Sequence, residues 1–344
     1  MGFCCVPGTH IALDELRALT PQISVIIPLR ASSPWLHECL AHLELQTFHS
    51  FDIYIVPDEP VALAGPRLHA IPSGRVLPNR KRQLAALASS AEILAFIDDD
   101  AYPDPEWLAS AVRHFSDPNV VAAGGPAVTP PGDSPRQRAS GAIFAASIVS
   151  SSTRRRYIAE AACDVDVLPS CNLLIRREAF LRDAGASTAY WPGEDTLVCL
   201  FATRNGGRIV YDPAALVYHH RRAVFAAHLR QVWSYGRFRG FFLRRFGRSP
   251  RYAAYAVPAA FVLAHAGVLV ALTRSRLRGP ALAAAGTYAA LVAWSGLREG
   301  RAARANPWLV GAGIYLSHVV YGCASIFGWL LGVPSGDGSA RRRR

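Results

Sequence analysis

Three consecutive aspartates, Asp98 to Asp100, directly follow an apolar run in this chain. The run, Ile93-Leu94-Ala95-Phe96-Ile97, has the composition of a strand buried on both faces of a parallel sheet. Carboxylates that follow such a strand lie at the carboxyl edge of the sheet, where α/β proteins bind ligands. Three adjacent like charges need a cation, and carboxylate oxygens favour Mg²⁺ or Mn²⁺. The alternative is a solvated acidic turn before a helix, with Asp104-Pro105-Glu106 as its N-cap.

The charge of the chain favours an anionic partner. Among 344 residues the formal net charge is +12, and Lys81 is the only lysine, so nearly all of the cationic side chains are arginines. Nucleotide diphosphates and acidic membrane surfaces both suit such a charge. No zinc-finger or RNA-binding signature is visible, so a nucleic-acid partner is not expected.

The cysteines indicate a reducing compartment. Seven are scattered through the chain without CxxC spacing. That pattern favours free thiols on the cytosolic side of a membrane over a disulfide framework or a zinc site. The N-terminus has no charged-then-apolar signal peptide, so the first domain is expected to stay in the cytoplasm.

Strand-like and helix-like segments alternate after a lead-in at residues 1–21. Such alternation predicts an α/β layer architecture with a mostly parallel sheet, in a domain over residues 22–222. The predicted strands are 23–28, 51–56, 93–97, 120–126, a segment around 173–175, 208–211 and 214–219, and the predicted helices are 34–46, 79–90 and 195–205.

The remaining residues point to a membrane. Residues 223–251 mix arginine with aromatic residues, which predicts an interfacial segment. Residues 252–332 hold three apolar segments, 252–273, 281–297 and 308–332, and a span needs about 20 apolar residues. The middle segment is marginal, so two or three transmembrane helices are predicted. Arginines in both loops and in the tail, 333–344, leave open whether one segment is re-entrant or one basic loop lies outside.

Five blocks in order resemble the family 2 glycosyltransferases of the GT-A fold, in their membrane-anchored form. The blocks are VIIPLR at 25–30, FDIYIVPDEP at 51–60, NRKRQLAALASSAEILAFIDDDA at 79–101, LPSCNLLIRREAF at 168–180 and GEDTLVCLFATRNGGRIVYDPAALVYHH at 193–220. The resemblance covers about residues 22–240. It implies a Rossmann-like domain that binds a nucleotide-sugar donor.

The resemblance also implies a divalent metal, Mn²⁺ or Mg²⁺, that neutralises the leaving diphosphate. Asp98 and Asp100 match the family's metal-binding and donor-binding DxD motif, with Asp98 toward the ribose or base and Asp99 interposed. His219 and His220 occupy the place where family members keep a metal-binding histidine. Which of the two would bind, and whether either does, is left open by the sequence.

Two further blocks match the family's donor site. Asp58 corresponds to the acid that contacts the nucleobase, although the block here is Pro-Asp-Glu-Pro, so Glu59 is the alternative. Arg80, Lys81 and Arg82 are expected to contact the diphosphate, the alternative being a solvated helix start.

On the acceptor side, the resemblance implies a catalytic carboxylate in a Glu-Asp pair. Such a base takes the proton of the attacking hydroxyl. Asp195 is the first choice and Glu194 the second. Asn172 is expected to position the sugar or acceptor, and Trp191 to stack on a sugar face or to lie in the core.

Together these features predict an inverting glycosyltransferase with a cytoplasmic catalytic domain, anchored to the inner or plasma membrane. Its acceptor would be lipid-linked, saccharide or membrane-proximal, as in the synthesis of cell-envelope glycans or glycolipids. One alternative is a processive polysaccharide synthase, although the Gln-x-x-Arg-Trp block of such enzymes is not matched at 231–235. Another is a non-catalytic membrane subunit that binds nucleotide sugars.

Overall fold

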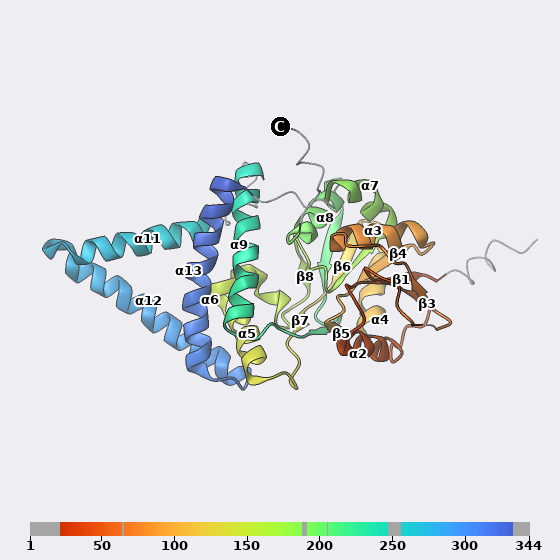
Figure 1. Ribbon diagram of the computed structural model, residues 1–344, viewed down its shortest axis with the longest axis horizontal. Coiled ribbons are helices and arrows are strands. Elements are labelled where there is room, and N and C mark those ends of the chain that lie inside the picture. The colour runs from red at the N-terminus through yellow and green to blue at the C-terminus, as the bar shows by residue number, and fades with distance from the viewer. Residues whose placement is uncertain (1–20, 64, 188–190, 205, 247–255, 333–344) are drawn as a thin grey trace, which may run out of the picture.

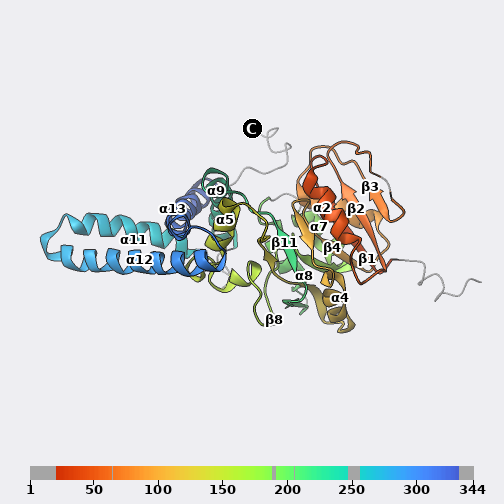
Figure 2. The ribbon, with the colours of Figure 1, turned by 90° about the horizontal axis from the view of Figure 1, so that it is seen from below.

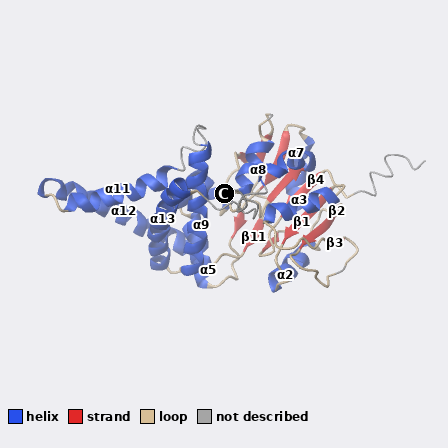
Figure 3. Ribbon diagram, turned by 45° about the horizontal axis from the view of Figure 1, so that its top comes forward, coloured by secondary structure: helices blue, strands red, loops and turns tan. Residues whose placement is uncertain are grey.

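The chain folds into an α/β part and a helical part that lie side by side (Figure 1). The computed structural model describes residues 21–332 except 64, 188–190, 205 and 247–255. All strands gather in the α/β part, and the helical part extends away from it (Figure 3). The predicted lead-in and tail therefore lie almost entirely outside the described residues.

A mixed sheet of eight strands forms the centre of the α/β part. In spatial order the strands are β3 (Leu68–Ala70), β2 (Phe51–Val56), β1 (Ile23–Pro28), β4 (Ile93–Phe96), β9 (Leu173–Arg176), β6 (Val120–Gly124), β10 (Arg208–Tyr211) and β8 (Cys163–Asp164). All neighbours are parallel except at β9, which is antiparallel to β4 and β6, and at β8, which is antiparallel to β10. A smaller sheet has the order β5 (Ala101–Pro103), β11 (Val217–His219) and β7 (Ala127–Val128).

Helices cover both faces of the large sheet because its strands are apolar on both sides. The helices of this part are α2 (Pro34–Leu43), α3 (Pro78–Ala88), α4 (Trp107–Val112), the 3₁₀ turn η1 (Arg113–Ser116), α7 (Arg177–Ser187) and α8 (Glu194–Ala202). Along β1, Ile23 and Val25 pack with α2 and α4, whereas Ile26 packs with α3 and α7 on the other face. The predicted α/β architecture is confirmed. Strands that are apolar on both faces need helices on both sides of the sheet.

Asp212, just after β10, joins two neighbouring elements in this core. Its carboxylate is 3% exposed and accepts hydrogen bonds from Arg113 and from the ring of His114, with Oδ2 2.5 and 2.7 Å from their nitrogens. Burial raises the pKa of Asp212, but these bonds and one from the Ala214 backbone outweigh it and lower the pKa.

The helical part consists of one central pair and one projecting hairpin. Its elements are α5 (Pro135–Ala145), α6 (Ser147–Ser150), the 3₁₀ turn η2 (Ser151–Arg156), α9 (Ala226–Phe246), α11 (Val257–Leu272), α12 (Ser275–Ala302) and α13 (Pro307–Leu331). Helices α11 and α12 run beside each other, away from the α/β part (Figure 2). Helices α12 and α13 are long and apolar enough to cross a membrane, and α11 is a shorter apolar helix.

Helices α9 and α13 approach each other closely at glycines. A Cβ on Gly240 would lie 1.9 Å from the carbonyl oxygen of Ser325, and one on Gly328 would lie 1.9 Å from that of Arg237. Small residues permit such backbone contact between helices. The pair thus packs with its backbones in close contact.

Two phenylalanines of α9 are buried, which differs from the sequence-based interpretation. Phe242 is fully buried and Phe238 is 9% exposed, and both pack on Leu197 and Phe201 of α8. These rings are therefore part of the protein core rather than of a lipid interface. Residues 247–251 of the predicted interfacial segment lie outside the described residues.

Helix α5 connects the two parts of the molecule. It lies within the predicted domain 22–222, yet Ala139 and Ile143 pack against Val310 and Ile314 of α13. The boundary at residue 222 remains a prediction. Because α5 shares this core with α13, truncation of the chain after residue 222 would expose apolar side chains.

Candidate active site

The triple aspartate lies at the carboxyl edge of the sheet, as its position after β4 predicts. Strand β11 pairs antiparallel with β5 and sets His219 opposite Ala101, which brings its ring to Asp100. The His219 Nε2 atom lies 3.1 Å from Asp100 Oδ1. One ligand atom from each of Asp98, Asp100 and His219 falls within 4.8 Å of the others.

These three residues fit a divalent cation. Two carboxylates and one imidazole are a donor set that suits Mn²⁺. Burial raises the pKa of Asp100, but the neighbouring His219 outweighs it and lowers the pKa, which keeps Asp100 ionised. Burial and the flanking carboxylates of Asp100 and Asp98 raise the pKa of Asp99 to about 7. A dication at this position would relieve that repulsion.

His220 does not join this cluster, which corrects its inclusion among the predicted metal ligands. Its Nδ1 lies 2.5 Å from Asp133 Oδ1 and its Nε2 lies 2.9 Å from Glu38 Oε2. The ring also stacks on Trp35. His220 follows the end of β11, and both of its ring nitrogens pair with these other carboxylates, so only His219 pairs with Asp100.

Lys81 ties together the ends of two strands. Its side chain is 3% exposed and donates to the Leu29 carbonyl, after β1, and to the Asp58 carboxylate, after β2. The predicted diphosphate contact would require Lys81 to share these bonds with a ligand. Glu59 and Arg80 are exposed at the same cleft.

Arg82 connects the donor side of the site to the two candidate catalytic carboxylates, Glu194 and Asp195. Its guanidinium is almost fully buried and lies 2.8 Å from Asp98 Oδ1 and 3.1 Å from Glu194 Oε1. It also lies over the Phe96 ring, 5.6 Å from the centroid. This arrangement was not foreseen, because Arg82 and Glu194 are 112 positions apart in the chain.

Glu194 and Asp195 open α8 but differ in environment. Gly193 precedes them with φ of 108°, a left-handed conformation that glycine adopts without strain. Glu194 is 5% exposed, and burial, opposed by Arg82, raises its pKa to about 7. Asp195 is half-buried, accepts from the Thr196 amide at 2.7 Å and pairs with no cation among the described residues. Asp195 is thus the carboxylate better placed to meet an acceptor.

The two residues predicted to contact the acceptor have different environments. Asn172 is fully buried and bonds to Trp107 Nε1 at 2.8 Å and to the carbonyls of Pro126 and Ala215. It therefore joins α4 and two neighbouring loops and is not among the residues that line the cleft, which corrects the predicted acceptor contact. Trp191 is 45% exposed and lies on the cleft wall, so its predicted stacking on a sugar remains a proposal.

One cleft of about 2390 Å³ joins these groups. It runs from Asp58 and Asp98, past Asp195, to the facing sides of α9, α11, α12 and α13. Sequence reasoning missed the part of its wall formed by η2 and α9. The sequence signal for the α9 wall is a set of residues spaced three or four apart, which lie on one face of a helix. They are Ala227, Arg230, Gln231, Ser234, Tyr235 and Phe238.

Comparison with known proteins agrees with this geometry. Residues 24–182 match the family described as Glycosyl transferase family 2. This stretch is a family 2 glycosyltransferase domain. Curated relatives are the Pre-mycofactocin glycosyltransferases of two Mycobacterium tuberculosis strains, CDC 1551 / Oshkosh and ATCC 25618 / H37Rv. Each is 27% identical over 146 residues, which are 42% of this chain and only 30% of the relative.

A solved structure shares the fold over nearly the whole chain. It is a mannosyltransferase from Pyrobaculum calidifontis in complex with GDP-Man and Mn²⁺, with a TM-score of 0.61 and 18% identity. The similarity covers 91% of this chain and 88% of that one, so it includes the helical part. The family model confirms the predicted family over residues 24–182, and the structural similarity confirms the predicted GT-A fold.

Proposed function

We propose that the chain is an inverting glycosyltransferase that moves a sugar from a nucleotide donor to a hydroxyl of a lipid-linked or membrane-proximal acceptor. The observation that carries the proposal is one continuous cleft. It holds the acidic cluster of Asp98, Asp100 and His219, the carboxylate of Asp195, and a wall of apolar helices. Synthesis of cell-envelope glycans or glycolipids is the process that such an acceptor suggests.

The residues divide the chemistry between them. A divalent cation held by Asp98, Asp100 and His219 would neutralise the charge of the departing diphosphate. Asp195 takes the proton of the acceptor hydroxyl while the hydroxyl oxygen forms a bond to the anomeric carbon. The bond from that carbon to the diphosphate oxygen breaks, and the nucleoside diphosphate leaves. A single displacement of this kind inverts the anomeric centre.

Arg82 fixes the start of α8 relative to the cluster of Asp98, Asp100 and His219. Because it bonds to both Asp98 and Glu194, the start of α8 cannot move relative to the acidic cluster without breaking a buried ion pair. Removal of one partner from such a pair typically costs about 3 to 5 kcal/mol. The position of Asp195 next to Glu194 follows from this link.

The membrane assignment rests on α12 and α13. In the proposed orientation the α/β part lies in the cytoplasm, where nucleotide sugars and reduced thiols are found. The cleft then opens next to the membrane surface, within reach of an acceptor in the cytoplasmic leaflet.

A screen of nucleotide sugars for Mn²⁺-dependent thermal stabilisation of the full-length protein tests the donor half of the proposal. A bound donor raises the unfolding midpoint by mass action. We expect one nucleotide to stabilise the protein with Mn²⁺ and not with EDTA. Absence of metal-dependent stabilisation by every donor would overturn the proposal, and stabilisation without turnover on any lipid acceptor would favour a non-catalytic binding subunit.

A further inference from the structure

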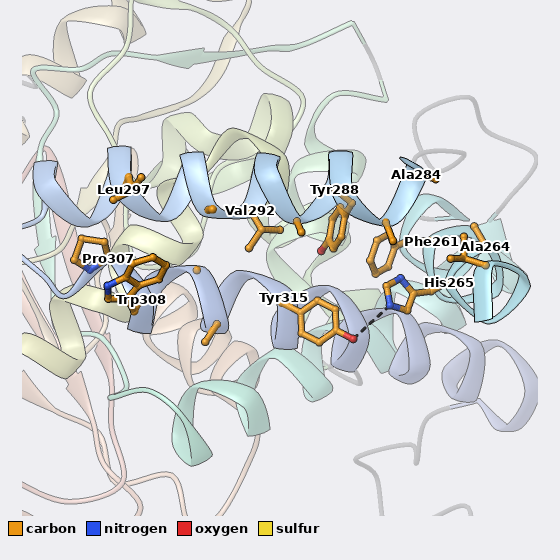
Figure 4. A pocket seen from close by; sticks show the side chains of 16 residues that line it. Phe261, Ala264, His265, Ala284, Tyr288, Val292, Leu297, Pro307, Trp308 and Tyr315 are labelled. Carbon is orange, nitrogen blue, oxygen red and sulfur yellow. Dashed lines mark hydrogen bonds between the residues drawn. The ribbon is translucent and has the colours of Figure 1, made fainter. Parts of the chain in front are cut away.

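An apolar groove of about 580 Å³ lies between the three C-terminal helices. Its lining comes from α11, α12 and α13, with Phe261, Ala264 and His265 toward one end and Leu297 and Trp308 at the other (Figure 4). The volume is in the range of pockets that hold small organic ligands. In the proposed orientation, with α12 and α13 as membrane spans, the groove would lie at the depth of the lipid chains.

Several polar atoms in and beside this groove pair with one another. Tyr315 Oη lies 3.4 Å from His265 Nε2, and Tyr288 Oη lies 2.7 Å from His318 Nδ1. The second nitrogen of His318 lies 2.8 Å from the carbonyl oxygen of Ile148. With these groups paired, the wall offers little to a polar ligand, so its chemistry favours an apolar chain.

The groove continues into the catalytic cleft. Phe261 and Tyr288 line both, so an extended molecule could lie in the two at once. Beyond these rings the cleft wall is formed by Ser317, His318 and Tyr321 of α13 and by Tyr235 of α9. The wall of the joined groove and cleft therefore changes from apolar to polar toward Asp195.

Arginines line the cleft into which the groove opens. Arg156 of η2 and Arg230 of α9 line the cleft, and neither guanidinium group has an ion pair or hydrogen bond among the described residues. Arg239, on the same helix as Arg230, donates to Thr196 Oγ1 at 2.9 Å, next to Asp195. Guanidinium groups are suited to phosphate oxygens, which they bind with charge-assisted hydrogen bonds.

We propose that the acceptor is an anionic lipid whose phosphate contacts Arg156 and Arg230 and whose hydrocarbon chain lies in the groove between α11, α12 and α13. The inference rests on the proposed function, since it names the acceptor class of the same site. The accepting hydroxyl belongs to the headgroup, and the two arginines place it beside Asp195. A neutral lipid would fill the groove but leave the arginines without an anion.

The test measures binding of oleyl phosphate to the full-length protein in neutral-detergent micelles, read as a shift of the unfolding midpoint. Oleyl alcohol supplies the chain without the phosphate, and glycerol 3-phosphate supplies a phosphate without the chain. We expect stabilisation by oleyl phosphate alone. Arg230→Gln should weaken this binding about tenfold, the effect of one charge-assisted hydrogen bond. Arg276→Gln, which removes an equal charge from the exposed start of α12, should not.

A second pair of variants tests the groove. Ala285 lines it, whereas Ala283, exposed on the same helix, does not. Ala285→Trp should weaken oleyl phosphate binding by filling the groove, and Ala283→Trp should leave it unchanged. Equal binding by all variants, or equal stabilisation by oleyl alcohol, would overturn the inference. So would a change of oligomeric state in Ala285→Trp, which would assign the groove to a second copy of the chain.

Donor binding separates this inference from the proposed function. Stabilisation by the Mn²⁺-dependent nucleotide sugar should be the same in wild type, Arg230→Gln and Ala285→Trp. If the wild type binds a donor but not oleyl phosphate, only the acceptor inference fails. If it binds no donor, the proposed function fails.

Discussion

Gly240 offers a sharp test of the close contact between α9 and α13. An alanine there would place its Cβ 1.9 Å from the Ser325 carbonyl oxygen and 2.9 Å from the Trp329 amide nitrogen. Carbon and oxygen atoms normally approach no closer than about 3.3 Å, so the two helices must separate by more than about 1 Å. Overpacking typically costs about 1 to 3 kcal/mol, and contact with backbone atoms places Gly240→Ala at the upper end.

The assay is thermal unfolding of the full-length protein in detergent, alongside turnover. A loss of about 3 kcal/mol should lower the midpoint by roughly 5 to 10 °C, given the size of the protein. Gly286→Ala is the matched control, because a Cβ there meets nothing within 4 Å. The control should be neutral or more stable by up to about 1 kcal/mol, the helix preference for alanine over glycine. Equal midpoints for the two variants would refute the close helix contact.

The remaining predictions concern the base, acid stability and the domain boundary. Asp195→Asn should lower turnover by roughly 10² to 10⁴ while donor binding persists; if Glu194→Gln is the inactive variant instead, the roles of the pair are reversed. Because the pKa of Asp212 is lowered in the folded state, its carboxylate stabilises the fold above its unfolded pKa of about 3.9, and this is lost as pH falls through the lowered value. Urea unfolding at pH 7 and pH 3 should therefore show that Asp212→Asn loses more stability at pH 7 than at pH 3, and a loss equal at both values would contradict this. Truncation after residue 222 should yield an aggregating protein by size-exclusion chromatography, since it exposes Ile143 and its neighbours, whereas a monodisperse product would support an independent domain.

The sequence predicted those parts of the site that depend on neighbours in the chain. Asp98 and Asp100 follow a buried strand, so their place at the sheet edge required only the strand itself. The α/β architecture followed in the same way from apolar runs at regular intervals. The antiparallel direction of β9 could not be predicted, because a strand buried on both faces has the same composition in either direction.

Contacts between distant segments were beyond sequence reasoning. Arg82 was predicted to contact the diphosphate, or else to lie at a solvated helix start, yet it is buried between Asp98 and the distant Glu194. Phe242 looked like a membrane contact because nothing in the chain shows that α8 covers it. Asn172 looked available to an acceptor, but its amide joins neighbouring loops. In each case the tertiary partner decides the role, and its identity is not encoded locally.

Direct measurement of Mn²⁺ binding tests the central claim, that Asp98, Asp100 and His219 hold the metal of a nucleotide-sugar site. Electron paramagnetic resonance of free Mn²⁺ in the presence of GDP or UDP would compare wild type with Asp100→Asn. Asp104→Asn, which alters a carboxylate directly after β5 and outside the cluster, is the control. We predict that wild type and Asp104→Asn bind Mn²⁺ with either nucleotide, and that Asp100→Asn binds it at least about tenfold more weakly, because an amide is a poorer ligand for a hard cation. Equal Mn²⁺ binding by Asp100→Asn and wild type would contradict the account.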